Sequence, residues 1–361
     1  MSNKRIFLDI HAIQTLPPSN MNRDDSGSPK TAQYGGVRRA RVSSQAWKRA
    51  IRRFFAEFGA ENVGVRTKRI VAYLAEQILD VDSANSAEDA MELAEKTFET
   101  AGLKIDKKEK AAKALFFIGK RQAKALAEAA VQHKQDISDK KNKEMLQSIL
   151  KANPEIDIAL FGRMVADDPS LNDDASAQVA HAISTHAVQT EFDYYTAMDD
   201  KNPEDQAGAG MIGTVEYNSS TLYRYANIAV HDLCSQLEDK EATVSAVKLF
   251  IEAFAKSLPT GKVNTFANQT LPQALMINIR EDRPVSLVSA FENPVRSDRG
   301  FVKESTDRMF AELKKTEKFV EQPLLTLYIK PEECNGVSEG KEETSFAELL
   351  KDTADELNAI L

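Results

Sequence analysis

One segment of the chain combines an apolar stripe with an unbroken run of positive charge, and the fold must accommodate both. Residues 26–56 contain eight cations and no Asp or Glu. From Trp47 onward, apolar side chains recur at helical spacing, and Ser43 or Ser44 stands where a helix N-cap is expected. We therefore expect a helix that buries one face and exposes cations on the other. The cations of the predicted helix are Lys48, Arg49, Arg52 and Arg53. The other four cations of the segment precede the helix and are Lys30, Arg38, Arg39 and Arg41.

The chain as a whole is acidic, with a formal net charge of −8. Since residues 26–56 carry +8, the remaining 330 residues carry −16. Charges are screened beyond about 8–10 Å at physiological salt, so the basic segment can still bind a polyanion. The plainer alternative is a solvated basic helix face that binds nothing.

Length and composition set broad limits on the class of protein. At about 150 residues per domain, 361 residues make about two domains, enough to bury a core without disulfides. Cys234 and Cys334 are a hundred residues apart and suit a reducing cytoplasm. No apolar run reaches the roughly 18 residues of a membrane span, and the first residues lack a signal-peptide pattern. We expect a cytoplasmic protein without membrane contact.

Local patterns predict both strands and helices. Apolar residues at every second position predict a half-buried strand over 6–13, and residues 17–29 are too rich in Pro, Gly, Asn and Asp for regular structure. Residues 34–37 predict a tight turn and 38–42 a short extended piece. A proline-free, Ala-, Lys- and Glu-rich composition predicts several helices over 61–151. Further extended runs are expected at 156–164, 180–188, 215–227 and 274–279.

The second half of the chain contains three more segments of note. Residues 193–213 are irregular between extended flanks, which predicts the tip of a long hairpin. Residues 235–256 predict an amphipathic helix. The tail 331–356 carries nine acids and two lysines, which predicts a surface linker and a terminal helix.

Earlier in the chain, residues 104–124 carry eight cations and two acids. This composition is typical of a solvated helix face, and contact with nucleic acid is the alternative.

Motifs for catalysis are sparse. The sequence contains no phosphate-binding P-loop, no dinucleotide fingerprint and no nucleophile elbow. His181 and His186 are five residues apart and diverge on either a helix or a strand, so we interpret them as packing or hydrogen-bonding residues rather than metal ligands. Four acid pairs lie in turn-like contexts, where Asp is favoured for backbone hydrogen bonds. These pairs are Asp24-Asp25, Asp167-Asp168, Asp173-Asp174 and Asp199-Asp200.

Nucleic-acid binding has the stronger support. Lys and Arg supply charge, while Ser43, Ser44 and Gln45 supply directed hydrogen bonds at a helix start that itself favours anions. No aromatic residue is interleaved with the expected exposed cations, because Trp47 and Phe54 belong to the apolar face. We therefore expect contact with the phosphate backbone that is mostly independent of base sequence.

At this point the residues resemble a known family. Residues 22–25 and 34–50 are similar to the N-terminal signature of CasC, the "Cas seven" backbone subunits of the type I-E CRISPR complex Cascade, in the RAMP superfamily. The resemblance spans about residues 6–295 and is weak over 61–150 and the acidic tail. Further matching blocks follow in order, at 159–164, 180–186, 192–200, 223–228 and 289–292.

The resemblance implies an α+β fold shaped like a hand. Its palm is an RNA-recognition-motif-like (ferredoxin-like) sheet, its fingers are a helical insertion, and its thumb is a long β-hairpin. On this basis we expect fingers over 61–150, a thumb over 186–223, and an acidic tail with a terminal helix over 331–361. The palm then takes the remaining segments, 1–60, 151–185 and 224–330.

The resemblance also implies a function in antiviral defence. Copies stack head to tail along the guide RNA (crRNA), join other Cascade subunits and support recognition of a target DNA strand that pairs with the guide. Members of the type I-E family are not nucleases, so no catalytic residue, metal or cofactor is expected. Related subunits of type III complexes cut RNA with an aspartate near the thumb, a role that we do not transfer to Asp24 or Asp25.

Guide-RNA contacts of the family transfer onto individual positions of this chain. In addition, Lys140, Lys141 and Lys143 match a lysine cluster on the fingers. The expected RNA-binding residues are Arg23, Lys30, Ser43, Gln45, Lys48, Arg49, Arg52, Met164 and Lys141.

Two other interpretations stay open at this stage. One is a metal-dependent RNA endonuclease of the RAMP superfamily that uses the acid pairs or the histidines. The other is a generic cytosolic domain with an incidental basic helix, which predicts no salt-sensitive RNA binding.

Overall fold

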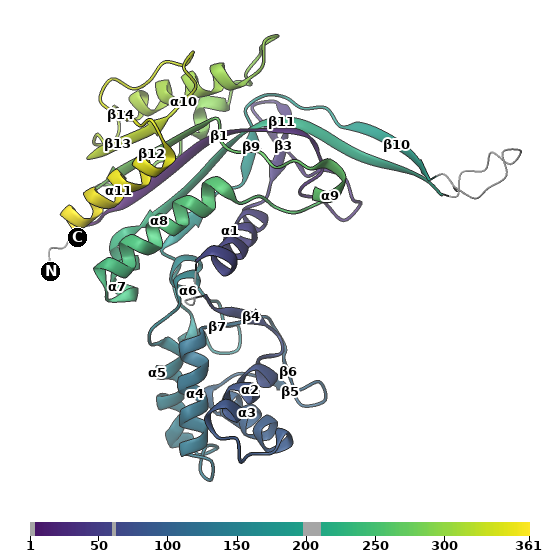
Figure 1. Cartoon of the computed structure of the whole chain (residues 1–361), viewed down its shortest axis with the longest axis vertical. Coiled ribbons are helices and arrows are strands. Elements are labelled where there is room, and N and C mark those ends of the chain that lie inside the picture. The colour runs from purple at the N-terminus through teal and green to yellow at the C-terminus, as the bar shows by residue number, and fades with distance from the viewer. Residues whose placement is uncertain (1–3, 60–62, 198–210) are drawn as a thin grey trace, which may run out of the picture. The chain divides into compact units, whose positions relative to one another are not determined.

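The computed structural model describes residues 4–59, 63–197 and 211–361 (Figure 1). The chain divides into two compact units. The sheet unit comprises Met1–Ile51, Val179–Asn227 and Phe250–Ile360, and the helical unit comprises Arg52–Gln178 and Ile228–Leu249, with Leu361. The predicted mixed α+β fold is confirmed. The finer division into palm, fingers and thumb stays a prediction.

One large sheet organises the sheet unit. Among the described residues, ten strands join in the order β14-β13-β12-β1-β11-β9-β3-β2, and β8 and β10 each pair with β11. Antiparallel pairing of β1 with β12 runs from Phe7↔Arg280 to Ile13↔Ala274. The strands are β1 (Phe7–Ser19), β2 (Thr31–Tyr34), β3 (Val37–Val42), β8 (Ala177–Val179), β9 (Ala182–Ser184), β10 (Glu191–Ala197), β11 (Met211–Ala229), β12 (Ala274–Arg280), β13 (Leu325–Ile329) and β14 (Lys341–Glu342).

The helices of the sheet unit include the predicted basic helix, α1. This helix spans Ser44–Phe58, so it begins in the sheet unit and continues into the helical unit. In the opposite sense, α8 (Lys240–Lys256) begins in the helical unit and ends in the sheet unit. The other helical elements are α9 (Val263–Phe266), η3 (Val288–Phe291), α10 (Val302–Thr316) and the predicted terminal helix, α11 (Phe346–Ile360).

The helical unit has its own apolar core, to which α2, α3, α4 and α5 contribute. The predicted helices over 61–151 are thus confirmed, but four short strands also lie in this range. The elements are β4 (Val65–Thr67), α2 (Ile70–Val81), α3 (Ala87–Ala101), β5 (Ile105–Asp106), β6 (Ala111–Ala112), β7 (Phe116–Ile118), α4 (Lys120–Gln132), η1 (Lys140–Asn142), α5 (Lys143–Lys151), α6 (Ile156–Phe161), η2 (Pro169–Leu171) and α7 (Val230–Leu237).

Several local predictions were wrong for identifiable reasons. Residues 156–164 do not form a strand, because the apolar run begins the short helix α6, which ends at Gly162 with a positive φ of 74°. The expected helix over 235–256 is interrupted at Glu238, whose φ is +53°. The first strand continues through Pro17 and Pro18, where the β12 register has already ended and a missing N–H costs no bond to that partner.

The predicted hairpin is confirmed in its arms. β10 pairs antiparallel with β11 from Glu191↔Tyr217 to Ala197↔Met211. The tip was expected over 193–213, but residues 193–197 and 211–213 belong to the paired strands. The rest of it, including Asp199-Asp200, lies outside the described residues. A second hairpin joins β2 and β3 through Gly35 and Gly36, which both have positive φ, as the predicted tight turn requires. The piece expected at 180–188 is extended only as β9.

The strand β1 is buried on both faces rather than on one, since every residue from Phe7 to Gln14 is buried. Its polar residues Asp9 and His11 are therefore buried and held by partners. Asp9 accepts hydrogen bonds from Tyr225 Oη at 2.8 Å and from Val285 N–H at 3.0 Å, and it lies 3.5 Å from the Arg280 guanidinium. His11 Nδ1 lies 2.9 Å from Tyr223 Oη.

This burial predicts an unusual dependence of stability on pH. Burial raises the pKa of Asp9 to about 7, so the native state binds this proton more tightly than the unfolded chain does. The resulting stabilisation is complete below the unfolded pKa of 3.8 and is lost as the pH rises through about 7. The free energy of unfolding of wild type, relative to Asp9→Asn, should fall by about 4 kcal/mol between pH 4 and pH 8.

Urea unfolding of both proteins across this pH range measures the difference. Burial lowers the pKa of His11 to about 3, but His11 is present in both proteins and cancels in the comparison. The assignment to Asp9 would be contradicted if the free energy of unfolding of wild type, relative to that of Asp9→Asn, stayed constant with pH or increased as the pH rises.

Candidate nucleic-acid interface

Side chains from separate segments hold the start of α1 in place. Ser43 Oγ accepts a hydrogen bond from Ala46 N–H at 3.4 Å, which makes Ser43 the N-cap, as predicted. Asn22 Oδ1 accepts from Ser43 N–H at 2.8 Å. His181 Nδ1 accepts from Ser44 N–H at 3.4 Å. The backbone N–H groups that open the helix are thus oriented by Asn22 and His181, to which sequence reasoning assigned no role at this site.

Two cations flank this helix start. Arg41 N–H donates to the Lys30 carbonyl at 2.9 Å, and Arg41 Nη1 lies 3.4 Å from His181 Nδ1. Burial, Arg41 and Lys30, in that order, lower the pKa of His181, so its ring is neutral at pH 7 and can accept the helix N–H. The first turn of α1 contains no acid. The helix dipole and the flanking side chains are therefore both positive at this end of α1, and both attract a negatively charged phosphate group.

The loop before β2 brings Arg23 close to the same place. Lys30 N–H donates to the Asn22 carbonyl at 2.8 Å, and Arg23 forms a β-bridge with Pro29, so the loop closes on itself. A cavity of about 20 Å³, room for about one water, lies between β1, β3, β11 and this loop, and Asn22, Lys30 and Arg41 help to line it. The structure thus gathers Arg23, Lys30 and Ser43 around the start of α1.

Asp24 builds this loop. Its Oδ1 accepts hydrogen bonds from Ser26 Oγ at 2.7 Å, from Ser26 N–H at 3.0 Å and from Ser28 N–H at 3.0 Å. These bonds, that of Ser26 first, lower the pKa of Asp24. The carboxylate therefore has a conformational role in a turn, as expected for Asp in such a context.

The other expected residues of the sheet unit lie on the following turns of α1. Gln45 and Arg49 are exposed, whereas Lys48 is half-buried and burial lowers its pKa. Arg39, which precedes the helix in the basic segment and lies on β3, is not available to a ligand. Arg39 is fully buried and donates to the carbonyls of Tyr34, Ser184 and Phe291, so its charge supports the backbone instead of a ligand.

In the helical unit, the expected residue Arg52 has a structural partner. Its Nε lies 3.1 Å from Asp157 Oδ2, and its guanidinium lies 4.3 Å from the centre of the Phe117 ring. Asp157 is fully buried, burial raises its pKa, and its Oδ1 accepts from Gly64 N–H at 2.8 Å. The carboxylate of Asp157 thus depends on Arg52 for charge compensation.

The remaining expected residues of the helical unit are accessible. Met164 is 84% exposed. Lys141 forms ion pairs with Asp136 at 2.7 Å and Asp139 at 3.4 Å, and Lys143 with Asp168 at 3.3 Å. The expected lysine cluster is therefore on the surface, with part of its charge compensated. The assignment of these side chains, and of those in the sheet unit, to RNA binding stays a prediction.

Three of the residues considered for nuclease chemistry have other partners. His186 is buried, accepts from Thr221 N–H through Nε2 at 3.0 Å, and stacks on Phe301 with ring centres 3.7 Å apart. Asp168 caps η2 and bonds Gln147, and hydrogen bonds, that of Ser170 first, lower its pKa to about 2. Asp173 pairs with the buried Arg163 at 2.7 Å. Within the described residues, no group of three His, Cys, Asp or Glu side chains could hold a metal ion.

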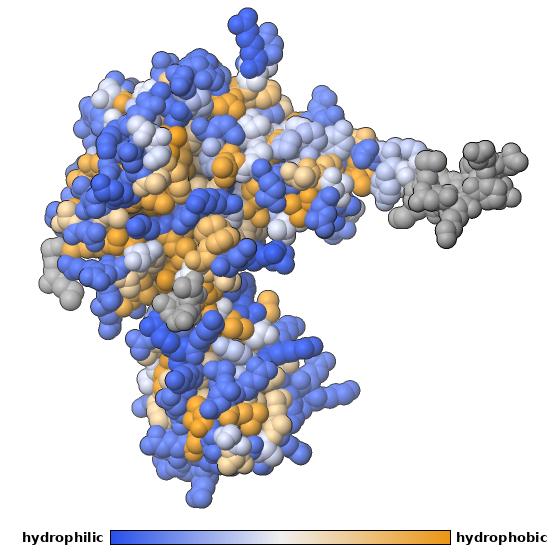
Figure 2. Space-filling model, in the orientation of Figure 1, coloured by the Kyte–Doolittle hydropathy of each residue, from blue (hydrophilic) through white to orange (hydrophobic). Residues whose placement is uncertain are grey.

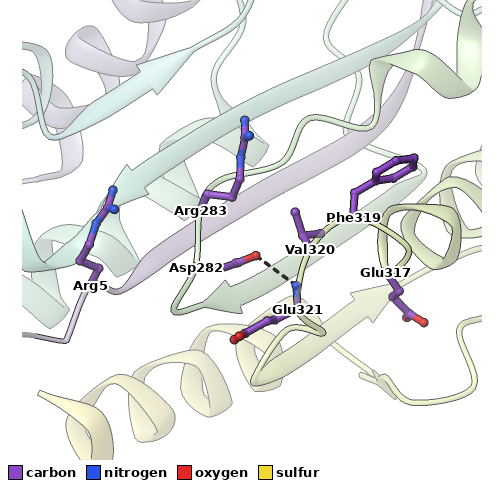
Figure 3. A pocket seen from close by; sticks show the side chains of 7 residues that line it. All are labelled: Arg5, Asp282, Arg283, Glu317, Phe319, Val320 and Glu321. Atoms are coloured by element: carbon purple, nitrogen blue, oxygen red, sulfur yellow. Dashed lines mark hydrogen bonds between the residues drawn. The ribbon is translucent and has the colours of Figure 1, made fainter.

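A second depression in the sheet unit has mixed charge (Figure 3). The guanidinium groups of Arg5 and Arg283 extend away from the carboxylates of Glu317 and Glu321 in this view. Asp282 accepts from Glu321 N–H at 3.2 Å, and Phe319 is 89% exposed. Because these side chains do not converge on one point, the start of α1 is the better candidate site.

Within the described residues, no helix is long and apolar enough to cross a membrane.

Comparisons with known proteins agree with this picture. The chain matches the family described as "CT1975-like protein" over residues 8–354. It is similar to a chain of a "CRISPR RNA-guided surveillance complex, pre-nicking", with a TM-score of 0.86 and 32% identity over 97% of this chain and 100% of the other. A chain of a second "CRISPR RNA-guided surveillance complex" matches with a TM-score of 0.75 and 29% identity, over 97% and 99%. No curated protein matches.

The chain is therefore a protein of the CRISPR-associated class, with the fold of surveillance-complex subunits. It belongs to the CT1975-like family. These matches support the predicted resemblance to a "Cas seven" subunit. Membership of type I-E stays a prediction.

Arg52 and Arg49 should behave differently on substitution. Arg52→Ala leaves the buried Asp157 without its cation and should lower the free energy of unfolding by about 3 kcal/mol. Arg49→Ala removes an exposed cation on the same helix and should change it by less than about 0.5 kcal/mol. Urea unfolding of the two variants tests the distinction, and equal losses would contradict it.

Proposed function

We propose that this protein is a non-catalytic backbone subunit that binds guide RNA (crRNA) and oligomerises along it within a type I-E Cascade complex. In that assembly it supports recognition of the target DNA strand that pairs with the guide, as part of antiviral defence. The similarity to subunits of CRISPR RNA-guided surveillance complexes over nearly the whole chain supports the class. Partners on this proposal are the crRNA, further copies of the chain and the other Cascade subunits.

The observation that carries the proposal is the acid-free start of α1. There the acid-free first turn and the flanking Lys30 and Arg41 favour an anion at the helix N-terminus. Cations and hydroxyls of this kind can bind phosphate and sugar without reading base edges, so they suit a guide whose sequence changes from one complex to the next.

The β10–β11 hairpin supports the assembly part of the proposal. Directly paired residues lie on the same face of a hairpin, so Phe192, Tyr194 and Ile212 share one face. Their exposed fractions are 65%, 65% and 58%. Figure 1 shows β10 and the paired part of β11 projecting beyond the other strands of the sheet, and apolar side chains exposed this way are suited to contact a partner. On the proposed assembly, that partner is the neighbouring copy on the RNA.

Assembly should follow RNA length, because a head-to-tail contact does not close by itself and the bound strand limits its growth. Mass photometry on RNAs of about 20, 40 and 60 nucleotides should show particles whose mass increases in steps of one subunit. The RNA should stay intact on incubation with Mg²⁺ or Mn²⁺. A fixed particle mass would contradict the backbone function. Cutting that disappears in Asp24→Ala or Asp25→Ala would instead favour an endonuclease.

The exposed hairpin face should matter for assembly and not for folding. Phe192→Ser combined with Tyr194→Ser should leave the melting temperature of the protein unchanged within about 2 °C, because both side chains are largely exposed. The same variant should form few particles larger than one subunit on long RNA.

Glu191→Ser combined with Asp193→Ser is the matched control, since it alters the alternating positions of the same strand. This control should assemble at least as well as wild type. Normal assembly of the Phe192 and Tyr194 variant would contradict the function given to this face.

A further inference from the structure

A cluster of cations in the helical unit, exposed except for the half-buried Lys110, lies apart in the sequence from every expected RNA-binding residue. Its members come from β4 with the residues between β4 and α2, and from the β5–β6 hairpin with the residue that follows it. The two segments meet where Ala112 N–H donates to the Lys68 carbonyl at 2.8 Å. The cluster consists of Arg66, Lys68, Arg69, Lys108, Lys110 and Lys113.

None of these cations forms an ion pair within the described residues. Within the described part of the chain, no Asp or Glu oxygen lies within 4.0 Å of a side-chain nitrogen of any of the six, whereas the neighbouring Lys104 and Lys107 pair with Asp167 and Glu99. Of the two acids in the hairpin, Asp106 accepts from Lys108 N–H at 2.9 Å and Glu109 N–H at 3.1 Å. These backbone bonds, that of Glu109 first, lower the pKa of Asp106, and the charge of Lys113 lowers it further. Its carboxylate thus fixes the turn that displays the lysines.

The β5–β6 hairpin places its lysines in or next to a turn at the surface. The β5–β6 register, Ile105↔Ala112 and Asp106↔Ala111, places Lys108 and Lys110 in the connecting turn, and Lys110 has a positive φ of 48°. Apolar neighbours Ile105 and Ala112 belong to the core of the unit, which anchors the hairpin. Figure 2 shows hydrophilic side chains projecting from the part of the unit that carries β5 and β6. The segment 104–124 is therefore not one helix face, as its composition suggested, because only residues 120–124 belong to a helix, α4.

We propose that this cluster binds the phosphate backbone of duplex DNA. Six cations without an ion pair, on two segments joined by the Ala112–Lys68 backbone bond, match a polyanion of high charge density, and duplex DNA carries one negative charge per about 1.7 Å of its axis. Single-stranded nucleic acid is bound through aromatic platforms as well as charge, and no aromatic residue belongs to this cluster. The cluster adds a second nucleic-acid surface to the proposed guide-binding one and does not depend on it.

The test compares two variants of the full chain that carry the same change in net charge. The cluster variant replaces Lys68, Lys108, Lys110 and Lys113 by Gln. The control replaces Lys124, Lys151, Lys240 and Lys248 by Gln, which are exposed lysines elsewhere in the same unit. Fluorescence anisotropy measures binding to a 30-base-pair DNA of arbitrary sequence and to a single-stranded RNA of 30 nucleotides, from 50 to 200 mM salt. Circular dichroism melting confirms that both variants fold.

The cluster variant should bind duplex DNA at least tenfold more weakly at 100 mM salt, and the slope of log K against log salt should fall in magnitude by about 3 to 4. The control should lose less than threefold, and RNA binding should be retained by both. Equal losses of duplex binding in the two variants, or no loss in either, would overturn the proposal. So would a cluster variant that loses RNA and duplex to the same degree. Failure of wild type to assemble on RNA would refute the proposed function alone.

Discussion

The position of α1 depends on one buried cation, Arg224. Its guanidinium lies 3.7 Å from the centre of the Trp47 ring and 4.3 Å from that of Phe254, and it donates to Gln14 Oε1 and to the Phe254 carbonyl. Burial lowers its pKa to about 9, so the group stays protonated at neutral pH. One side chain on β11 thus links the central strand β1, the first half of α1 and the end of α8. Cation–π contacts at buried sites contribute about 2 kcal/mol or more.

The candidate site follows from this anchor. Because Trp47 fixes the first turns of α1 against the sheet, Ser43 and Ser44 come to lie where Asn22 and His181 can accept their N–H groups. The same arrangement leaves Gln45 and Arg49 on the exposed side of the helix. The chain therefore uses arginine in two ways within one segment. Arg39 satisfies buried carbonyls and Arg52 compensates a buried acid, whereas Arg49 is exposed and suited to a phosphate.

The sequence was informative where a local pattern determines the structure. Helical spacing from Trp47 onward and a serine cap were sufficient to predict α1, and the Gly35-Gly36 pair was sufficient to predict the β2–β3 turn. Burial of β1 on both faces could not be predicted from its own alternation, since it results from strands and helices distant in the sequence. Likewise, nothing in a list of arginines separates Arg39 from Arg49. Hydrogen-bond partners more than a hundred residues away make that difference. The functions of Asn22 and His181 also arise only from tertiary contacts.

The central claim is that the start of α1 binds RNA through phosphates without reading bases. The most direct measurement is the salt dependence of affinity for several RNAs of unrelated sequence, in wild type and in a Lys48→Gln, Arg49→Gln double variant that leaves the Arg52–Asp157 pair intact. Loss of two phosphate contacts should reduce the slope of log K against log salt by about 1.4 for every RNA, with similar losses of affinity. An unchanged slope, or a loss confined to particular base sequences, would contradict the claim.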